Sequence, residues 1–188
     1  QFFFAGAIGR EFAKKIIAFL GEKPTVAQAD DAVAPTTKGS GNLRFRDVVF
    51  SYPGTDKPAV DRFSLDVRAG ETVALIGHSG SGKTTVANLV LRTLAPTSGT
   101  IEIDGQPVEK VTLDWVREQI ALVPQDPYLF YGTIADNLRL ARPDATDQEL
   151  IDAAKAANIW DFIQASPAGL QTLVGERGVQ LSGGQKQR

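Results

Sequence analysis

The chain of 188 residues contains no cysteine, no methionine and a single histidine. Without cysteine it can form neither a disulfide framework nor a thiolate zinc site, which is compatible with a reducing compartment. Because methionine is absent and the first residue is Gln1, we expect the natural start of the protein to lie upstream. The net charge of −2 indicates neither a nucleic-acid partner nor an attachment to a strongly anionic membrane.

Long uninterrupted apolar runs are also scarce. Apolar residues recur every four positions near the N-terminus, and this spacing predicts a helix over residues 1–29. Arg10, Glu11 and Lys14–Lys15 interrupt the run, so this stretch is no membrane span by itself. Residues 30–41 have no apolar period and are rich in Asp, Thr, Gly and Ser, which predicts a linker. An ordered surface loop is the alternative.

Glycine is concentrated in Gly77–Thr84, which fits the phosphate-binding P-loop pattern G-x-x-x-x-G-K-[ST]. Glycines permit the tight turn and bring backbone N–H groups close to an anion. Lys83 adds a charge that can reach the β- and γ-phosphates, and the Thr84 hydroxyl can bind Mg²⁺. A chance glycine-rich turn is the alternative. The residues predicted to hold a nucleotide here are Gly77, His78, Ser79, Gly80, Ser81, Gly82, Lys83, Thr84 and Thr85.

The flanks of this loop supply the context that a P-loop needs. The apolar run Thr72–Ile76 predicts a buried strand before it, and Thr85–Leu94 predicts a helix after it. The N-terminal end of that helix would point its dipole at the phosphates.

Further elements follow from periodicity and turn residues. Alternation predicts strands at Leu43–Phe50 and Val60–Val67. A shorter strand is predicted at Ile101–Ile103, closed by a hairpin turn at Asp104–Gly105, and a core strand at Ile120–Val123. A helix is predicted to open at Asp147, because acidic residues fill its first turn, and we expect Phe162 and Ile163 to continue that helical region.

The chain ends in Leu181–Arg188, LSGGQKQR. By physics alone, Ser182 before two glycines and a basic run indicates a helix N-cap and an anion site, and a solvated loop is the alternative. Together with the P-loop, this stretch resembles the ATP-binding cassette (ABC) family, in which LSGGQ is the signature motif. The resemblance implies that Ser182, Gly183, Gly184 and Gln185 contact the nucleotide of an opposing cassette.

The resemblance covers most of the chain. Tyr52 resembles the A-loop aromatic that stacks on adenine, with an ordinary strand-end tyrosine as the alternative. Gln125 resembles the Q-loop glutamine, which in the family contacts Mg²⁺ or the attacking water; the alternative is a polar surface residue. Thr172–Gly178 resembles the segment before the signature in ABC exporters, although Leu173 stands where an acidic residue is usual.

The resemblance implies an α/β fold of the P-loop NTPase type: a RecA-like core, an antiparallel β subdomain and an α-helical signature subdomain. We expect residues 1–29 to be the end of a transmembrane domain or its connecting helix, 30–41 a linker, and 42–188 the ATP-binding domain. In the family a Walker B Asp, a catalytic Glu and a switch histidine follow the signature. This chain stops at Arg188, so we expect an incomplete fold that is inactive alone.

The function implied by the resemblance is ATP hydrolysis with Mg²⁺, in which Lys83 and Gln125 are catalytic and Thr84 and Gln125 bind the metal. It would power export of a small molecule or lipid by a fused exporter half, on the cytoplasmic side of a membrane, with the bacterial inner membrane favoured. The implied partners are a second cassette, identical or different, and the fused transmembrane domain, with no nucleic acid. The alternatives are a catalytically degenerate cassette, a stand-alone ATPase subunit, and a soluble ABC protein.

Overall fold

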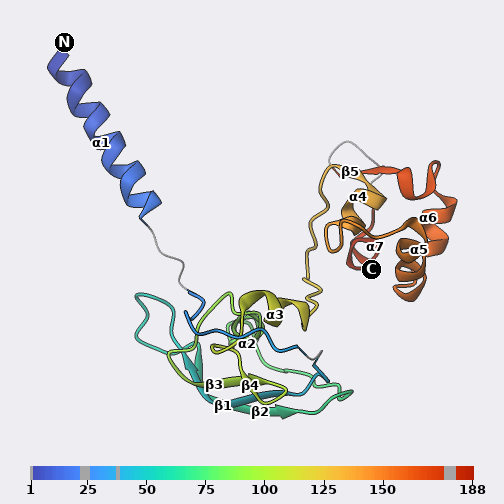
Figure 1. The fold of residues 1–188 in the computed structure, drawn as a ribbon, viewed down its shortest axis with the longest axis horizontal. Coiled ribbons are helices and arrows are strands. Elements are labelled where there is room, and N and C mark those ends of the chain that lie inside the picture. Colours follow the sequence, from blue (N-terminus) through green and yellow to red (C-terminus); the bar gives the residue numbers. More distant parts are fainter. Residues whose placement is uncertain (1, 22–25, 37–38, 176–180) are drawn as a thin grey trace. The chain divides into compact units, whose positions relative to one another are not determined.

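The computed structural model describes residues 2–21, 26–36, 39–175 and 181–188, with the side chains of residues 2–9 left out (Figure 1). The chain divides into two compact units, Gln1–Ala121 and Leu122–Arg188, and each is considered by itself.

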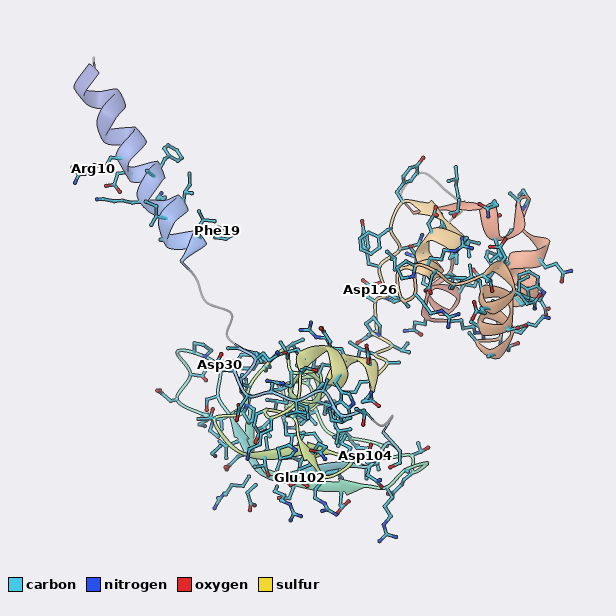
Figure 2. All side chains as sticks on the ribbon, viewed as in Figure 1. Arg10, Phe19, Asp30, Glu102, Asp104 and Asp126 are labelled. Carbon is cyan, nitrogen blue, oxygen red and sulfur yellow. The ribbon has the colours of Figure 1, made fainter. Side chains whose placement is uncertain are left out.

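The first unit begins with the helix α1, Phe2–Leu20. The helix is shorter than the predicted 1–29, because residues 26–29 are not helical, and residues 22–25 lie outside the described part. The described side chains of α1, including Arg10 and Phe19, are exposed (Figure 2). Within the described ranges, no helix combines the length and the apolar content that crossing a membrane requires.

An antiparallel sheet of four strands, in the order β2-β1-β3-β4, forms the body of the first unit (Figure 1). The strands β1, Leu43–Phe50, and β2, Val60–Val67, have the predicted bounds. The strand β3, Ser98–Ile103, contains the predicted Ile101–Ile103 and turns at Asp104–Gly105 into β4, Gln106–Pro107, so the predicted hairpin is confirmed.

Two helices pack on this sheet. They are α2, Lys83–Val90, and α3, Leu113–Glu118. The core between helices and sheet contains Phe45, Leu89, Ile101 and Val116, all fully buried. Buried residues alternate in β3, whereas in β1 an irregular register between Phe45 and Val48 interrupts the alternation.

Two predicted strands are wrong. Thr72–Ile76 and Ile120–Val123 have no regular structure, and Ile76 is 95% exposed and Val123 67% exposed. Both segments are apolar enough for a core strand, but a strand exists only where a neighbour completes its hydrogen bonds. Among the described strands, none pairs with either segment.

The helix after the P-loop is also shorter than the predicted Thr85–Leu94. It begins at Lys83 and its last helical residue is Val90, because Arg92 adopts a left-handed conformation with φ of 51°. The amide of Arg92 donates to the Leu89 carbonyl and that of Thr93 to the Asn88 carbonyl. These two bonds form a Schellman motif, which terminates the helix.

The second unit is helical, apart from the short pair of strands β5, Gly132–Thr133, and β6, Leu173–Val174. Its helices are α4, Ile134–Arg139; α5, Asp147–Ala156; α6, Trp160–Ala165; the 3₁₀ helix η1, Gly169–Gln171; and α7, Gly183–Gln187. The predicted helix start at Asp147 is confirmed. Phe162 and Ile163 are helical but belong to a separate helix, because Asn158, with φ of 57°, breaks the chain direction after α5. Residues 176–180, which include part of the exporter-like stretch Thr172–Gly178, lie outside the described residues.

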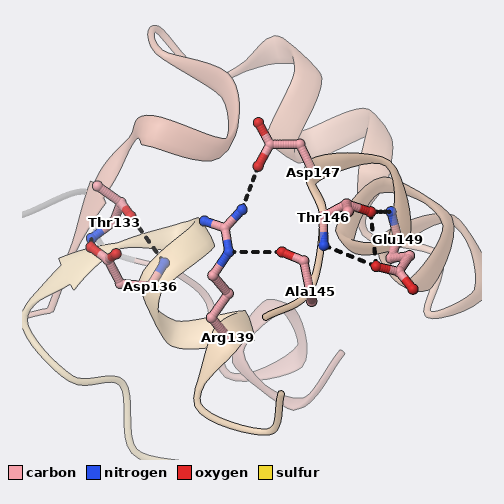
Figure 3. A network of polar contacts seen from close by, with 7 residues as sticks. All are labelled: Thr133, Asp136, Arg139, Ala145, Thr146, Asp147 and Glu149. Atoms are coloured by element: carbon pink, nitrogen blue, oxygen red, sulfur yellow. Dashed lines mark hydrogen bonds and ion pairs between the residues drawn. The ribbon is translucent and has the colours of Figure 1, made fainter. Parts of the chain in front are cut away.

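Polar caps and one arginine stabilise the start of this unit (Figure 3). Thr133 caps α4 in a capping box with Asp136, and Thr146 caps α5 in a capping box with Glu149. From the end of α4, the Arg139 guanidinium donates to the Ala145 carbonyl at 3.0 Å and pairs with Asp147 at the start of α5. Hydrogen bonds from the backbone and side chain of Thr146, and one from Arg142, lower the pKa of Glu149 to about 2.

Candidate nucleotide-binding site

The predicted P-loop lies between the unpaired segment 72–76 and α2. Gly80 and Gly82 have φ of 82° and 86°, in the left-handed region that favours glycine. Gly82 is also the N-cap of α2, and a Cβ atom there would lie 2.4 Å from the Ala59 carbonyl oxygen. A side chain on Gly77 would meet the Ser81 hydroxyl at 2.5 Å. Gly82 is therefore required by close approach to the backbone as well as by its conformation, whereas the contact at Gly77 is with a side chain that can rotate.

Lys83 folds back over this loop. Its ammonium donates to the carbonyls of Gly77 and His78, both at 2.8 Å, and to the Ser81 hydroxyl at 3.2 Å. The positive charge is thus held at the loop, next to the N-terminal end of α2, where the helix dipole also favours an anion. His78 does not point to this charge: its Nδ1 contacts the Ser79 carbonyl at 2.8 Å.

The two threonines after Lys83 have different surroundings. Thr84 is exposed, so its hydroxyl is free to face a ligand. Thr85 is buried, and its hydroxyl lies 3.1 Å from that of Tyr52. The role of a metal ligand suits Thr84, whereas Thr85 supports a neighbouring side chain.

Tyr52 is brought to the P-loop helix from the loop that follows β1. Besides its contact with Thr85, the ring packs edge-on against Phe50, with centroids 4.9 Å apart and planes at 86°. The residue is 40% exposed, so part of the fixed ring remains accessible for stacking on a base. The structure therefore joins two predicted site features that are more than twenty positions apart in the sequence.

The other predicted site residues belong to the second unit. Ser182 is the N-cap of α7, and its hydroxyl accepts from the Gln185 amide at 3.3 Å, while the Gln185 side chain accepts from the Ser182 amide at 2.9 Å. Added Cβ atoms on Gly183 and Gly184 would meet nothing within 4 Å, so the backbone here is open to a ligand. Ser182 and Gln185 thus preorganise the helix start.

The backbone of Gln125 is hydrogen-bonded to α7, the helix that contains the glycines of the LSGGQ stretch. Its carbonyl accepts from the Gln187 side-chain amide at 3.0 Å. Sequence reasoning missed Gln187 because a polar residue near the end of a chain gives no local signal of a partner 62 positions away. This contact links the Q-loop-like segment to α7 within the second unit.

The residues present fit a magnesium nucleotide. The P-loop offers backbone amides, the Lys83 ammonium and the exposed Thr84 hydroxyl, which is the donor set that phosphates with Mg²⁺ require. Groups of three or more His, Cys, Asp or Glu side chains placed for a metal ion do not occur among the described residues. Of the two metal ligands proposed from the sequence, Thr84 belongs to the first unit and Gln125 to the second.

Comparison with known proteins shows which proteins this chain resembles. The ABC transporter family model matches residues 60–188. The ATP-dependent lipid A-core flippase of Thiobacillus denitrificans is 50% identical over 86% of this chain and 28% of the flippase. ABC transporter B family member 1 of Arabidopsis thaliana is 45% identical over 94% of this chain and 14% of that protein. A solved structure of a bacterial Atm1-family ABC exporter with ATP bound matches 96% of this chain and 31% of its own, with a TM-score of 0.86 and 38% identity.

Proposed function

Because this chain belongs to the ABC transporter family, we propose that it is the ATP-binding and ATP-hydrolysing part of a fused exporter half. The chain spans less than a third of each of the relatives described above. The activity, the transported substrate and the partners of the whole protein are therefore part of the proposal.

One observation carries the proposal: Lys83 and Tyr52 lie at the same end of α2. Lys83 holds its charge at the P-loop, and Tyr52 is hydrogen-bonded to Thr85, two residues further along the same helix. A positive charge for phosphates and an exposed aromatic face for a base, fixed by one helix, match the two ends of ATP.

Each residue of the site would have its own role in binding and hydrolysing ATP. The P-loop amides and Lys83 hold the β- and γ-phosphates, and Tyr52 stacks on adenine. Thr84 and Gln125 hold Mg²⁺, which when bound neutralises charge on the phosphates. Because phosphoryl transfer needs little covalent chemistry from the protein, the contribution of these groups is positioning and electrostatic stabilisation.

The assembly proposed around this site has two cassettes and a membrane domain. Ser182, Gly183, Gly184 and Gln185 would close over the γ-phosphate held by a second cassette, identical or different. The helix α1 would be the cytoplasmic end of the last membrane helix. The names of the flippase relatives favour a lipid as the exported substrate. The resemblance to ABC exporters favours the cytoplasmic side of a membrane, with a bacterial inner membrane preferred, as the location.

The test is Lys83→Ala in the full-length protein, purified in lipid nanodiscs. We expect ATP hydrolysis to fall by about 10²-fold or more, the scale of losing one charged donor at a reacting centre. Lys155→Ala, which removes an exposed lysine on α5, is the matched control and should keep wild-type turnover. Turnover within twofold of wild type in Lys83→Ala would overturn the proposal. Absent hydrolysis in the unmutated protein, with ATP still bound, would indicate a degenerate cassette.

A further inference from the structure

The segment between α1 and β1 follows the surface of the first unit instead of extending freely. We call residues 26–42 the strap; the structure describes 26–36 and 39–42. At its middle, Val33 forms a parallel bridge with Val111: its amide donates to the Lys110 carbonyl at 3.0 Å, and its carbonyl accepts from Thr112 at 3.1 Å. The described part of segment 30–41 thus forms backbone contacts with the first unit at Val33.

Each end of the strap has its own anchor. At the C-terminal end, the Asp104 carboxylate in the β3–β4 turn accepts from the Ser40 hydroxyl and from the amides of Gly41 and Asn42 (Figure 2). At the N-terminal end, the Leu113 amide donates to the Gln28 side chain at 3.1 Å. Arg92 donates to the Ala27 carbonyl at 3.4 Å.

Arg92 is an unusual residue for its position. It occupies the left-handed site that ends α2, where glycine is the usual choice, and it is only 5% exposed. A left-handed conformation is unfavourable for a non-glycine residue, and burying a guanidinium is unfavourable as well. Hydrogen bonds of the side chain offset both effects, because the guanidinium donates to the Val111 carbonyl at 2.8 Å as well as to the Ala27 carbonyl. The guanidinium thus joins the end of α2, the strand-like edge at Val111 and the strap.

Apolar packing does little to hold this end of the strap. A cavity of about 270 Å³ is lined by residues 26–29 together with Leu89, Leu94 and Val108. Open space between residues 26–29 and these side chains means that the strap is not close-packed against them. The polar contacts of Arg92 and Gln28 therefore carry the attachment.

We propose that Arg92 is a positioning residue that couples the P-loop helix to the strap. The same helix α2 begins at Lys83, in the phosphate site, and ends next to Arg92 after eight residues, about 12 Å later. A short helix moves as a rigid element, so a shift of α2 when phosphates bind is passed to Ala27. The inference rests on the proposed ATP site, and it assigns the strap a part in the response to ATP.

The test follows the strap directly by hydrogen exchange in the full-length protein, with and without saturating magnesium AMPPNP, a non-hydrolysable ATP analogue. The reporters are the amides of Val33, Thr112 and Leu113, which all bond across the strap contact. In the wild type we expect the nucleotide to slow their exchange by about fivefold or more, the lower range of allosteric coupling. In Arg92→Gln this response should vanish, while the nucleotide still protects the P-loop peptide.

A merely structural role gives a different result. It would speed exchange of the strap equally with and without nucleotide, leaving their ratio unchanged, and that outcome overturns the proposal. Arg92→Lys, which can reach one of the two carbonyls, should retain part of the response. If Arg92→Gln does not fold, Arg92→Lys decides, and an undiminished response in it overturns the proposal.

Two further variants separate this inference from the proposed function. Gln148→Ala, on α5 of the second unit, removes an exposed amide and should leave the strap response intact. Absence of P-loop protection by the nucleotide in the wild type contradicts the proposed function itself. Protection of the P-loop without any response of the strap contradicts only the coupling.

Discussion

Tyr52 offers the sharpest test of the candidate site, because its ring and its hydroxyl have separable roles. The ring is 40% exposed and is available for stacking, whereas the hydroxyl bonds to the buried Thr85 at 3.1 Å. Loss of one aromatic stacking partner costs about 1 to 3 kcal/mol, so Tyr52→Ala should weaken ATP binding by about 5- to 150-fold. Loss of one neutral hydrogen bond costs about 0.5 to 1.5 kcal/mol, so Tyr52→Phe should weaken it by about 2- to 10-fold.

The assay is calorimetric titration of magnesium AMPPNP into the full-length protein carrying each variant. Thr85→Val removes the same hydrogen bond from the other side, so it should resemble Tyr52→Phe, and the double variant should show no further loss. Tyr128→Ala removes a more exposed tyrosine, paired with Phe130 in the second unit, and is the matched control. Binding within twofold of wild type in Tyr52→Ala would refute the stacking role.

Three further predictions concern the first unit. Gly82→Ala should abolish detectable nucleotide binding in the same titration, because the added Cβ lies 2.4 Å from the Ala59 carbonyl at φ of 86°; normal affinity would contradict this. Leu89→Ala should lower the free energy of unfolding by about 2 to 5 kcal/mol in urea denaturation, since Leu89 is fully buried; a loss below 1 kcal/mol would contradict the core assignment. Desolvation raises the pKa of Asp104, but hydrogen bonds from Ser40, Asn42 and Gly41 outweigh it and bring the pKa from 3.8 to about 2. The stability that Asp104 contributes is therefore present above pH 3.8 and lost as pH falls towards 2, so the difference between wild type and Asp104→Asn should close over that range.

The elements predicted correctly from the sequence are those whose partners are close along the chain. β1 and β2 alternate in hydrophobicity and pair with each other, so the pattern contains all that their formation needs. The start of α5 is set by the capping box of Thr146 and Glu149, which is local as well. The strands predicted at Thr72–Ile76 and Ile120–Val123 were wrong for the opposite reason. Apolar composition indicates where burial is favourable, but a strand also needs a hydrogen-bonded neighbour.

The candidate site likewise combines features that nearby residues determine with features that depend on distant partners. The P-loop is recognisable because glycine, lysine and threonine at fixed spacing are required within eight residues. The contact between Tyr52 and Thr85 depends on how the loop after β1 returns to α2, which no spacing rule predicts. Arg92 escaped notice because it lay inside the predicted helix Thr85–Leu94, whereas the structure ends that helix at Val90 and buries Arg92 in a left-handed conformation.

In Ser182–Gln185, some residues of the motif are needed to shape the backbone and not to contact the nucleotide. In the capping box of α7, the Ser182 hydroxyl accepts from the Gln185 amide, so the third amide of the helix already has a partner. The amides of Gly183 and Gly184 precede it, and intrahelical bonding leaves the first amides of any helix unsatisfied. Because neither glycine carries a side chain and a Cβ there would meet nothing within 4 Å, an oxyanion can approach these two amides closely. We therefore expect the serine and the glutamine to set the geometry, and the two glycines to offer the phosphate contact.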